Sequence, residues 1–165
     1  MIWSVALLAF VTLERLGELV LARHNTSRLL ARGAVEHGAN HYPFIVVLHG
    51  AWLAGLWFLA WNLPIQPAWL TIFILLQGLR IWVPATLGER WTTRIIVLPE
   101  ASLVARGPYR SFSHPNYAVV VGEIAVLPLV FELGWYSLFF SLLNAAVLTV
   151  RIRAEDRALK NPMNI

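Results

Sequence analysis

The sequence predicts an all-α integral membrane protein, and the composition and the apolar runs carry that prediction. Of the 165 residues, 58% are hydrophobic and only 13% are charged, whereas soluble domains carry about 25% charged residues. The mean hydropathy is +0.64. The apolar runs are long enough to cross about 30 Å of hydrocarbon at about 1.5 Å per residue. We expect one membrane domain over residues 1–165, because the spans leave no room for a separate soluble domain.

The apolar runs predict five transmembrane helices. We expect them at residues 2–21, 43–61, 68–87, 115–133 and 135–153. The chain start lacks the basic region of a signal peptide, so the first run is expected to stay in the protein. Two connections are short, whereas His24 to Tyr42 and Gly88 to His114 form long loops. Long loops without periodicity usually carry function, so we expect the site in these two loops.

The charges outside the spans predict the orientation in the membrane. The basic residues outside the spans fall on the side of the long loops and the C-terminus. The positive-inside rule makes that side cytoplasmic, with the N-terminus outside. Aromatic residues that suit the outer interface cluster on the opposite side: Trp3, Trp61, Trp69, Trp135 and Tyr136. We therefore expect a protein of the cytoplasmic membrane that contacts the lipid bilayer and binds no nucleic acid.

Several charged residues interrupt the predicted spans: Glu14, Arg15, Glu18, Arg80 and Glu123. A charge at the centre of a transmembrane helix costs at least about 2.5 kcal/mol, so these side chains are expected to face the bundle interior. Arg15 and Glu18 are three residues apart and can pair on one helix face. One interpretation is an ion-pair lattice that holds the bundle, with Glu123 paired or protonated. The other interpretation is a functional site.

The second long loop contains the densest polar signal, ending at the start of the fourth span. Pro115 suits the first turn of a helix, which places His114 at the helix N-terminus. Backbone N–H groups there can bind an anion such as an amino-acid carboxylate. An ordinary helix cap by Ser113 or Asn116 is the alternative interpretation.

The C-terminal end contains a second polar stripe. Asn144, Arg151 and Glu155 lie on one face of a helix with 3.6 residues per turn. This stripe is either a snorkelling basic end with an ion pair or part of a pocket. No metal site is expected, because Gly38 separates His37 from His41 and no third ligand follows at a usual spacing. We expect His49 to be a core histidine bonded to another helix.

Taken together, Gly107-Pro108-Tyr109-Arg110, His114-Pro115 with Tyr117, and Arg151 followed by Glu155-Asp156 resemble the isoprenylcysteine carboxyl methyltransferase family and its phosphatidylethanolamine methyltransferase-like relatives. Further segments resemble a bacterial branch of this family that is often found beside type III polyketide synthases: Glu14-Arg15, Glu18-Leu19, residues 33–36, residues 41–43 and residues 90–99.

The resemblance implies S-adenosylmethionine as the methyl donor, bound on the cytoplasmic side. The residues implied to hold it are Val97, Leu98, Leu103, Gly107, Tyr109, His114, Pro115, Tyr117 and Glu155. Arg151 and Glu155 are implied to carry the chemistry. Two positions depart from the family pattern. Ser113 stands where many members have Arg, so a cation such as Arg110 would serve instead, and Glu155-Asp156 replaces a pair of glutamates.

The expected activity is methyl transfer to the oxygen of a small lipophilic acceptor such as an alkylpyrone or alkylresorcinol. An isoprenylated cysteine carboxylate is the alternative acceptor, and a polyketide synthase pathway enzyme is a candidate partner. Glu155 is the expected base, with Arg151 orienting it or lowering the pKa of the acceptor. The expected head-group contacts are Glu14, Glu18, His41 and Asn144. A rival hypothesis is a non-enzymatic polar bundle such as a small transporter subunit, which requires a polar track across the whole membrane.

Overall fold

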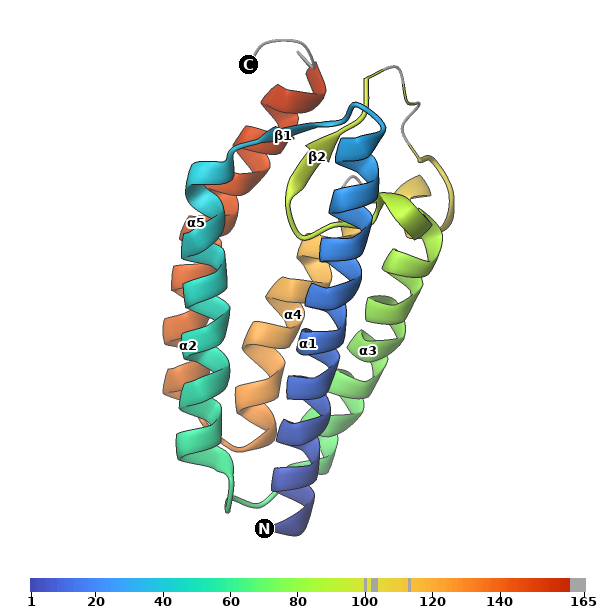
Figure 1. Cartoon of the computed structure of the whole chain (residues 1–165). Coiled ribbons are helices and arrows are strands. Elements are labelled where there is room, and N and C mark those ends of the chain that lie inside the picture. Colours follow the sequence, from blue (N-terminus) through green and yellow to red (C-terminus); the bar gives the residue numbers. More distant parts are fainter. Residues whose placement is uncertain (100, 102–103, 113, 161–165) are drawn as a thin grey trace.

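The structure, a computed structural model, describes residues 1–99, 101, 104–112 and 114–160. Long helices form where the apolar runs predicted them, and they pack lengthwise with the N- and C-termini at opposite ends of the bundle (Figure 1). Their bounds are α1 Ile2–Ala31, α2 Tyr42–Ala60, α3 Pro67–Leu87, α4 Pro115–Val130 and α5 Gly134–Lys160. Short elements connect them: 3₁₀ turns η1 Ala39–His41, η2 Gly88–Arg90 and η3 Gly107–Arg110, and strands β1 Val35–His37 and β2 Ile95–Val97.

Three helical segments are long and apolar enough to cross a membrane: Ala39–Ala60, Pro67–Arg90 and Gly134–Leu159. The apolar helix α4 has only 16 residues, about 24 Å at 1.5 Å per residue. Helix α1 carries three charged residues in its apolar half, namely Glu14, Arg15 and Glu18. The structure therefore supports a helical membrane protein with three spans, and the membrane crossing of α1 and α4 stays a prediction.

The outer surface of the bundle is apolar. Large side chains such as Trp3, Phe58 and Trp135 are 78%, 83% and 85% exposed. Such exposure suits lipid rather than water as the surrounding medium, because apolar patches of this extent are rare on soluble monomers. Trp3 and Trp135 lie in the first turns of α1 and α5, at the end of the bundle away from the two strands (Figure 1).

Helix α4 occupies the centre of the bundle and packs against both α3 and α5. Its side chains Ile124, Leu127 and Val130 are almost completely buried and join Leu56 and Phe73 in the main core. The backbone N–H of Gln66, just before α3, donates a hydrogen bond to the Val130 carbonyl over 2.8 Å. Helix α4 therefore supplies several side chains of the main core.

The predicted loop from His24 to Tyr42 is wrong over its first part, because α1 continues to Ala31. The extension is held by tertiary contacts. The Asn25 side-chain amide donates to the Trp91 carbonyl over 2.8 Å, and Ala22 packs with Val83 and Trp91 in a second small core. Helix α5 likewise runs past the predicted end of its span, to Lys160.

The all-α expectation also missed a small sheet between the two long loops. Strands β1 and β2 are antiparallel, with Val35 opposite Val97 and His37 opposite Ile95. Arg94 ties the sheet to its surroundings, since it binds the Glu36 carboxylate at 3.0 Å and lies over the Tyr42 ring at 4.7 Å. Strands of three residues leave no readable alternation in the sequence, and their pairing joins segments about 60 residues apart.

Candidate active site

Polar side chains gather at the end of the bundle that carries the small sheet. His114 occupies the N-cap position of α4, as predicted, and Pro115 is the first helical residue. The His114 ring stacks on the Tyr117 ring one turn later, with ring centroids 5.3 Å apart. His114 Nε2 lies 3.4 Å from Asp156 Oδ1 on α5. The start of α4 and the end of α5 are thus joined by the residues that the sequence singled out.

Tyr117, Arg151 and Glu155 form one hydrogen-bonded group. The Tyr117 hydroxyl donates to Glu155 Oε2 and accepts a bond from Arg151 Nε over 2.9 Å. The other end of the Arg151 guanidinium donates to the Thr93 carbonyl over 2.7 Å. Arg151 is 7% exposed, so its charge is held in a fixed, largely desolvated position. Asn144, Arg151 and Glu155, the predicted stripe on α5, therefore line cavities of the bundle.

Two cavities adjoin this group. The first, the loop cavity, has a volume of about 120 Å³ and lies among β2, η3, α4 and the end of α5. The second, the bundle cavity, has a volume of about 310 Å³ and lies between α1, α2, α4 and α5. Both cavities are lined by Trp91, Asn116, Tyr117 and Arg151. Molecules bound in the two cavities would meet at these four side chains.

The predicted donor-binding residues divide into three groups. Those that line the loop cavity are Val97, Tyr109, His114, Tyr117 and Glu155. Those outside its lining are Leu98, Gly107 and Pro115. Leu103 lies outside the described residues. The cations in the lining are Arg90, Arg94 and Arg151 rather than Arg110.

Gly107 has a structural requirement of its own. Its φ is +56°, a conformation that favours glycine, and a Cβ here would lie 2.7 Å from Thr86 Oγ1. This glycine lets the chain turn into η3 close against α3, which positions Tyr109 beside the loop cavity. Burial, reinforced by the negative charge of Glu155, raises the pKa of Tyr109 to about 12.

Of the predicted head-group contacts, Glu18 and Asn144 line the bundle cavity, whereas Glu14 and His41 do not. Glu14 instead lies 3.9 Å from Arg15. A contact of Glu14 or His41 with the acceptor therefore stays a prediction.

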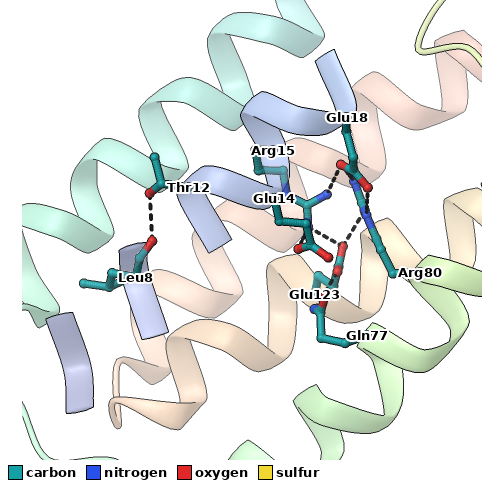
Figure 2. A network of polar contacts seen from close by, with 8 residues as sticks. All are labelled: Leu8, Thr12, Glu14, Arg15, Glu18, Gln77, Arg80 and Glu123. Carbon is teal, nitrogen blue, oxygen red and sulfur yellow. Dashed lines mark hydrogen bonds and ion pairs between the residues drawn. The ribbon is translucent and has the colours of Figure 1, made fainter. Parts of the chain in front are cut away.

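The intramembrane charges form the ion-pair lattice that one interpretation predicted, shown in Figure 2. Arg15 bonds Glu18 and Glu123 at 2.8 Å each, and Arg80 bonds the same two carboxylates. Gln77 donates to Glu123 over 2.9 Å. We call these five residues, Arg15, Glu18, Gln77, Arg80 and Glu123, the buried ion cluster. It joins α1, α3 and α4, and Arg15, Glu18 and Arg80 also form part of the bundle cavity wall.

Sequence reasoning missed Trp91 and Thr93 as site residues and treated Asn116 only as a possible cap. Their positions depend on η2 and β2 folding against α1, which no local pattern reports. We predicted that His49 bonds another helix, and this partner was wrong, because His49 Nδ1 bonds the Ile45 carbonyl of its own helix at 2.8 Å. Within the described part of the chain, no cluster of three or more histidine, aspartate or glutamate side chains is placed to hold a metal ion.

Fold and site together define a helical membrane protein with a polar site at one end of its bundle, between an apolar cavity and a polar one. The chain belongs to the isoprenylcysteine carboxyl methyltransferase family, whose model matches residues 69–161, more than half of the sequence. Members of this family are methyltransferases. The match begins in α3 and includes β2, the start of α4 and the polar stripe of α5.

Two bacterial relatives match over most of their length. The chain is 38% identical to the uncharacterized protein YpbQ of Bacillus subtilis (strain 168) over 159 residues, which cover 93% of this chain and 95% of the relative. It is 27% identical to an uncharacterized protein of Haemophilus influenzae (strain ATCC 51907 / DSM 11121 / KW20 / Rd) over 146 residues, 84% of each chain. No solved structure matches the chain.

Proposed function

We propose that this protein is a membrane methyltransferase that uses S-adenosylmethionine and methylates an oxygen atom of a small lipophilic acceptor. The observation that carries the proposal is the meeting of two cavities of different chemistry at Tyr117 and Arg151. Methyl transfer from a sulfonium needs donor and acceptor held in line with water excluded, and needs no covalent enzyme intermediate. Two adjoining cavities of this kind meet that requirement.

The residues of the loop cavity fit a donor with an adenosine and an amino-acid end. Leu87, Ile95 and Val97 offer apolar contact, while Arg90 and Glu155 offer opposite charges for the amino-acid carboxylate and ammonium. The indole N–H of Trp91 is buried without a hydrogen-bond partner in the described part of the chain, and such orphaned donors are rare unless a ligand uses them. When bound, S-adenosylmethionine supplies an activated electrophilic methyl group.

Arg151 and Tyr117 position the reacting groups in this proposal. Arg151 is anchored on Tyr117 and on the Thr93 carbonyl, so its charge stays at the junction of the cavities. A fixed cation there attracts an acceptor oxygen and favours its ionised form. Glu155 accepts the Tyr117 hydroxyl proton in a hydrogen bond and lines the loop cavity only. A role of Glu155 as base requires the acceptor to reach that cavity, and this role stays a prediction.

The bundle cavity supports an acceptor with an alkyl tail, such as an alkylpyrone or alkylresorcinol. Its walls include Leu16, Ile45, Leu53 and Val147, and Asn144 adds a buried amide. A lipophilic acceptor partitions into the bilayer and can reach such a cavity between helices. A type III polyketide synthase would supply acceptors of this chemistry, which makes an enzyme of that pathway a candidate partner.

The proposal includes an orientation. The end of the bundle with the small sheet faces the cytoplasm, where S-adenosylmethionine is made, and the N-terminus faces outward across the cytoplasmic membrane. The basic residues that flank the site, Arg28, Arg32, Arg94 and Arg106, support this orientation.

Calorimetric titration of the detergent-purified protein with S-adenosylmethionine and its demethylated product tests the function. We expect both to bind wild-type protein and neither to bind His114→Ala, which loses the ring stacked on Tyr117. The matched control is His24→Gln, because His24 is exposed on α1 and lines neither cavity. A folded wild-type protein that binds neither compound would contradict the proposal and return attention to the polar-bundle hypothesis.

A further inference from the structure

The methyl transfer described above leaves one polar side chain of the bundle cavity without a role, His49 on α2. Its Nδ1 lies 2.8 Å from the Ile45 carbonyl oxygen. A carbonyl only accepts hydrogen bonds, so Nδ1 carries the proton and Nε2 carries the lone pair of the neutral ring. Within the described part of the chain, Nε2 has no hydrogen-bond or ion-pair partner. His49, a residue of the bundle cavity wall, therefore has a ring nitrogen with an unused lone pair.

The other basic groups near this cavity are already engaged. Glu18 accepts hydrogen bonds from Arg15 and Arg80, so both of its carboxylate oxygens are occupied. Glu155 does not line the bundle cavity. The Tyr117 hydroxyl is held between Glu155 and Arg151. Among the described residues of the bundle cavity, His49 thus offers a ring nitrogen that takes no part in these hydrogen bonds.

We propose that His49 is a catalytic base that takes the proton of a neutral hydroxyl group on the acceptor. The inference rests on the proposed function and deepens it, because it specifies the acceptor class. An ionised carboxylate needs no base, whereas a phenol with a pKa of about 10 does. The acceptor is then a lipophilic phenol or enol rather than a lipophilic carboxylate.

The step balances as follows. The acceptor oxygen forms a bond to the methyl carbon while the bond from that carbon to the donor sulfur breaks, and sulfur keeps the electron pair. The hydroxyl proton moves to His49 Nε2, so the ring becomes an imidazolium. After the products leave, the imidazolium releases this proton to water.

Charged groups face His49 from the surrounding helices. Glu123 on α4 favours the protonated ring, whereas Arg15 on α1 and Arg151 on α5 disfavour it. Glu18 on α1 and Arg80 on α3 line the same cavity as a bonded pair of opposite charge. These groups are the charges that an imidazolium at this position would meet.

Two acceptor probes and a small set of variants test the inference. The probes are pentadecylresorcinol, a neutral phenol, and N-acetyl-S-farnesylcysteine, a carboxylate. In His49→Asn, the amide can still donate to the Ile45 carbonyl, but no basic nitrogen remains. We expect methylation of the resorcinol to fall about 10²- to 10⁴-fold, the usual contribution of a general base, with S-adenosylmethionine affinity unchanged. His24→Gln serves as the control and keeps wild-type turnover.

Two further readouts separate a base from a residue that only supports the fold. Added imidazole should restore part of the resorcinol turnover in His49→Ala. The wild-type rate should rise with pH through the titration range of a histidine, and this step should vanish in His49→Asn. A merely structural role for His49 would produce neither effect.

The possible failures are distinguishable. Wild-type protein that binds no S-adenosylmethionine overturns the proposed function itself. Wild-type protein that binds it but methylates only the carboxylate, or neither probe, overturns the acceptor class. Resorcinol turnover in His49→Asn within about twofold of wild type, at intact donor binding, overturns the role of His49 and leaves Glu155 as the base to test.

Discussion

The buried ion cluster and the group around Arg151 both combine arginine with a carboxylate, and they differ in how many hydrogen bonds the carboxylate accepts. In the buried ion cluster, Glu123 is 2% exposed and accepts hydrogen bonds from Arg15, Gln77 and Arg80. At the site, the Glu155 side chain is 27% exposed and accepts from the Tyr117 hydroxyl. The same residue types therefore form a densely bonded cluster in one place and a more exposed group in the other.

This contrast shows that an intramembrane charge is not by itself evidence of a functional site. The ion cluster joins three helices through hydrogen bonds to the Glu18 and Glu123 carboxylates, so it stabilises the bundle. Arg151 is bonded to the Tyr117 hydroxyl and to the Thr93 carbonyl, and the group around it adjoins two cavities. The number of hydrogen-bond donors that each carboxylate binds distinguishes the two groups, whereas the types of residue do not.

The strongest test of this contrast is Glu123→Ala, which we expect to cause the largest loss of stability. Removing the shared carboxylate leaves Arg15 and Arg80 with less compensation in a buried position. Breaking one partner of a buried ion pair typically costs about 3–5 kcal/mol. Chemical unfolding in detergent, followed by circular dichroism, measures the loss. An unchanged unfolding midpoint would contradict the structural role of the cluster.

A conservative substitution at the site should act on turnover instead of stability. Arg151→Lys keeps the charge but cannot bond both the Tyr117 hydroxyl and the Thr93 carbonyl with one planar group. We expect turnover to fall about 10- to 100-fold, or about 1.4 to 2.7 kcal/mol, with little change in the unfolding midpoint. If this variant lost folding while its folded fraction kept full turnover, the prediction would be wrong, because the substitution would then act on stability and not on turnover.

Alkaline pH gives a smaller effect that reports on the loop cavity. Burial and the charge of Glu155 raise the pKa of Tyr109 to about 12, above its usual value of about 10 in unfolded chains. The folded protein thus favours the neutral phenol, and this stabilisation is present below pH 10 and is lost as the pH rises toward 12. Tyr109→Phe should reduce the fall in stability over that range, measured by unfolding at each pH. Identical alkaline profiles would contradict the position of Tyr109.

The smallest effect is expected at an exposed ion pair. Glu89 bonds Arg28 at 2.8 Å and lies 3.6 Å from Arg32, but all three side chains are at least half exposed. Such pairs contribute at most about 1 kcal/mol. Glu89→Ala should therefore shift the unfolding midpoint slightly, and this shift should shrink further in high salt. A loss as large as that of Glu123→Ala would show that exposure is not what separates the two kinds of ion pair.

The sequence by itself determined the five helices and much of the site. Apolar runs broken by Pro and Gly set where the helices form, since both breakers act locally on the backbone. Pro115 set the start of α4 and His114 its N-cap. Spacing alone put Asn144 and Arg151 on one face of α5, and the short motifs were enough to indicate the family.

Only the tertiary structure decided which of these residues meet. Three features join segments that lie far apart in the chain. They are the pairing of β1 with β2, the packing of the α1 extension on Trp91, and the sharing of Glu18 and Glu123 between two arginines. The structure also decided that His49 Nδ1 bonds the Ile45 carbonyl of its own helix and that His49 lines the bundle cavity. Local sequence patterns indicate which backbone conformation a segment prefers and which residues share a helix face. Contact partners and cavities arise from long-range packing, which those patterns do not encode.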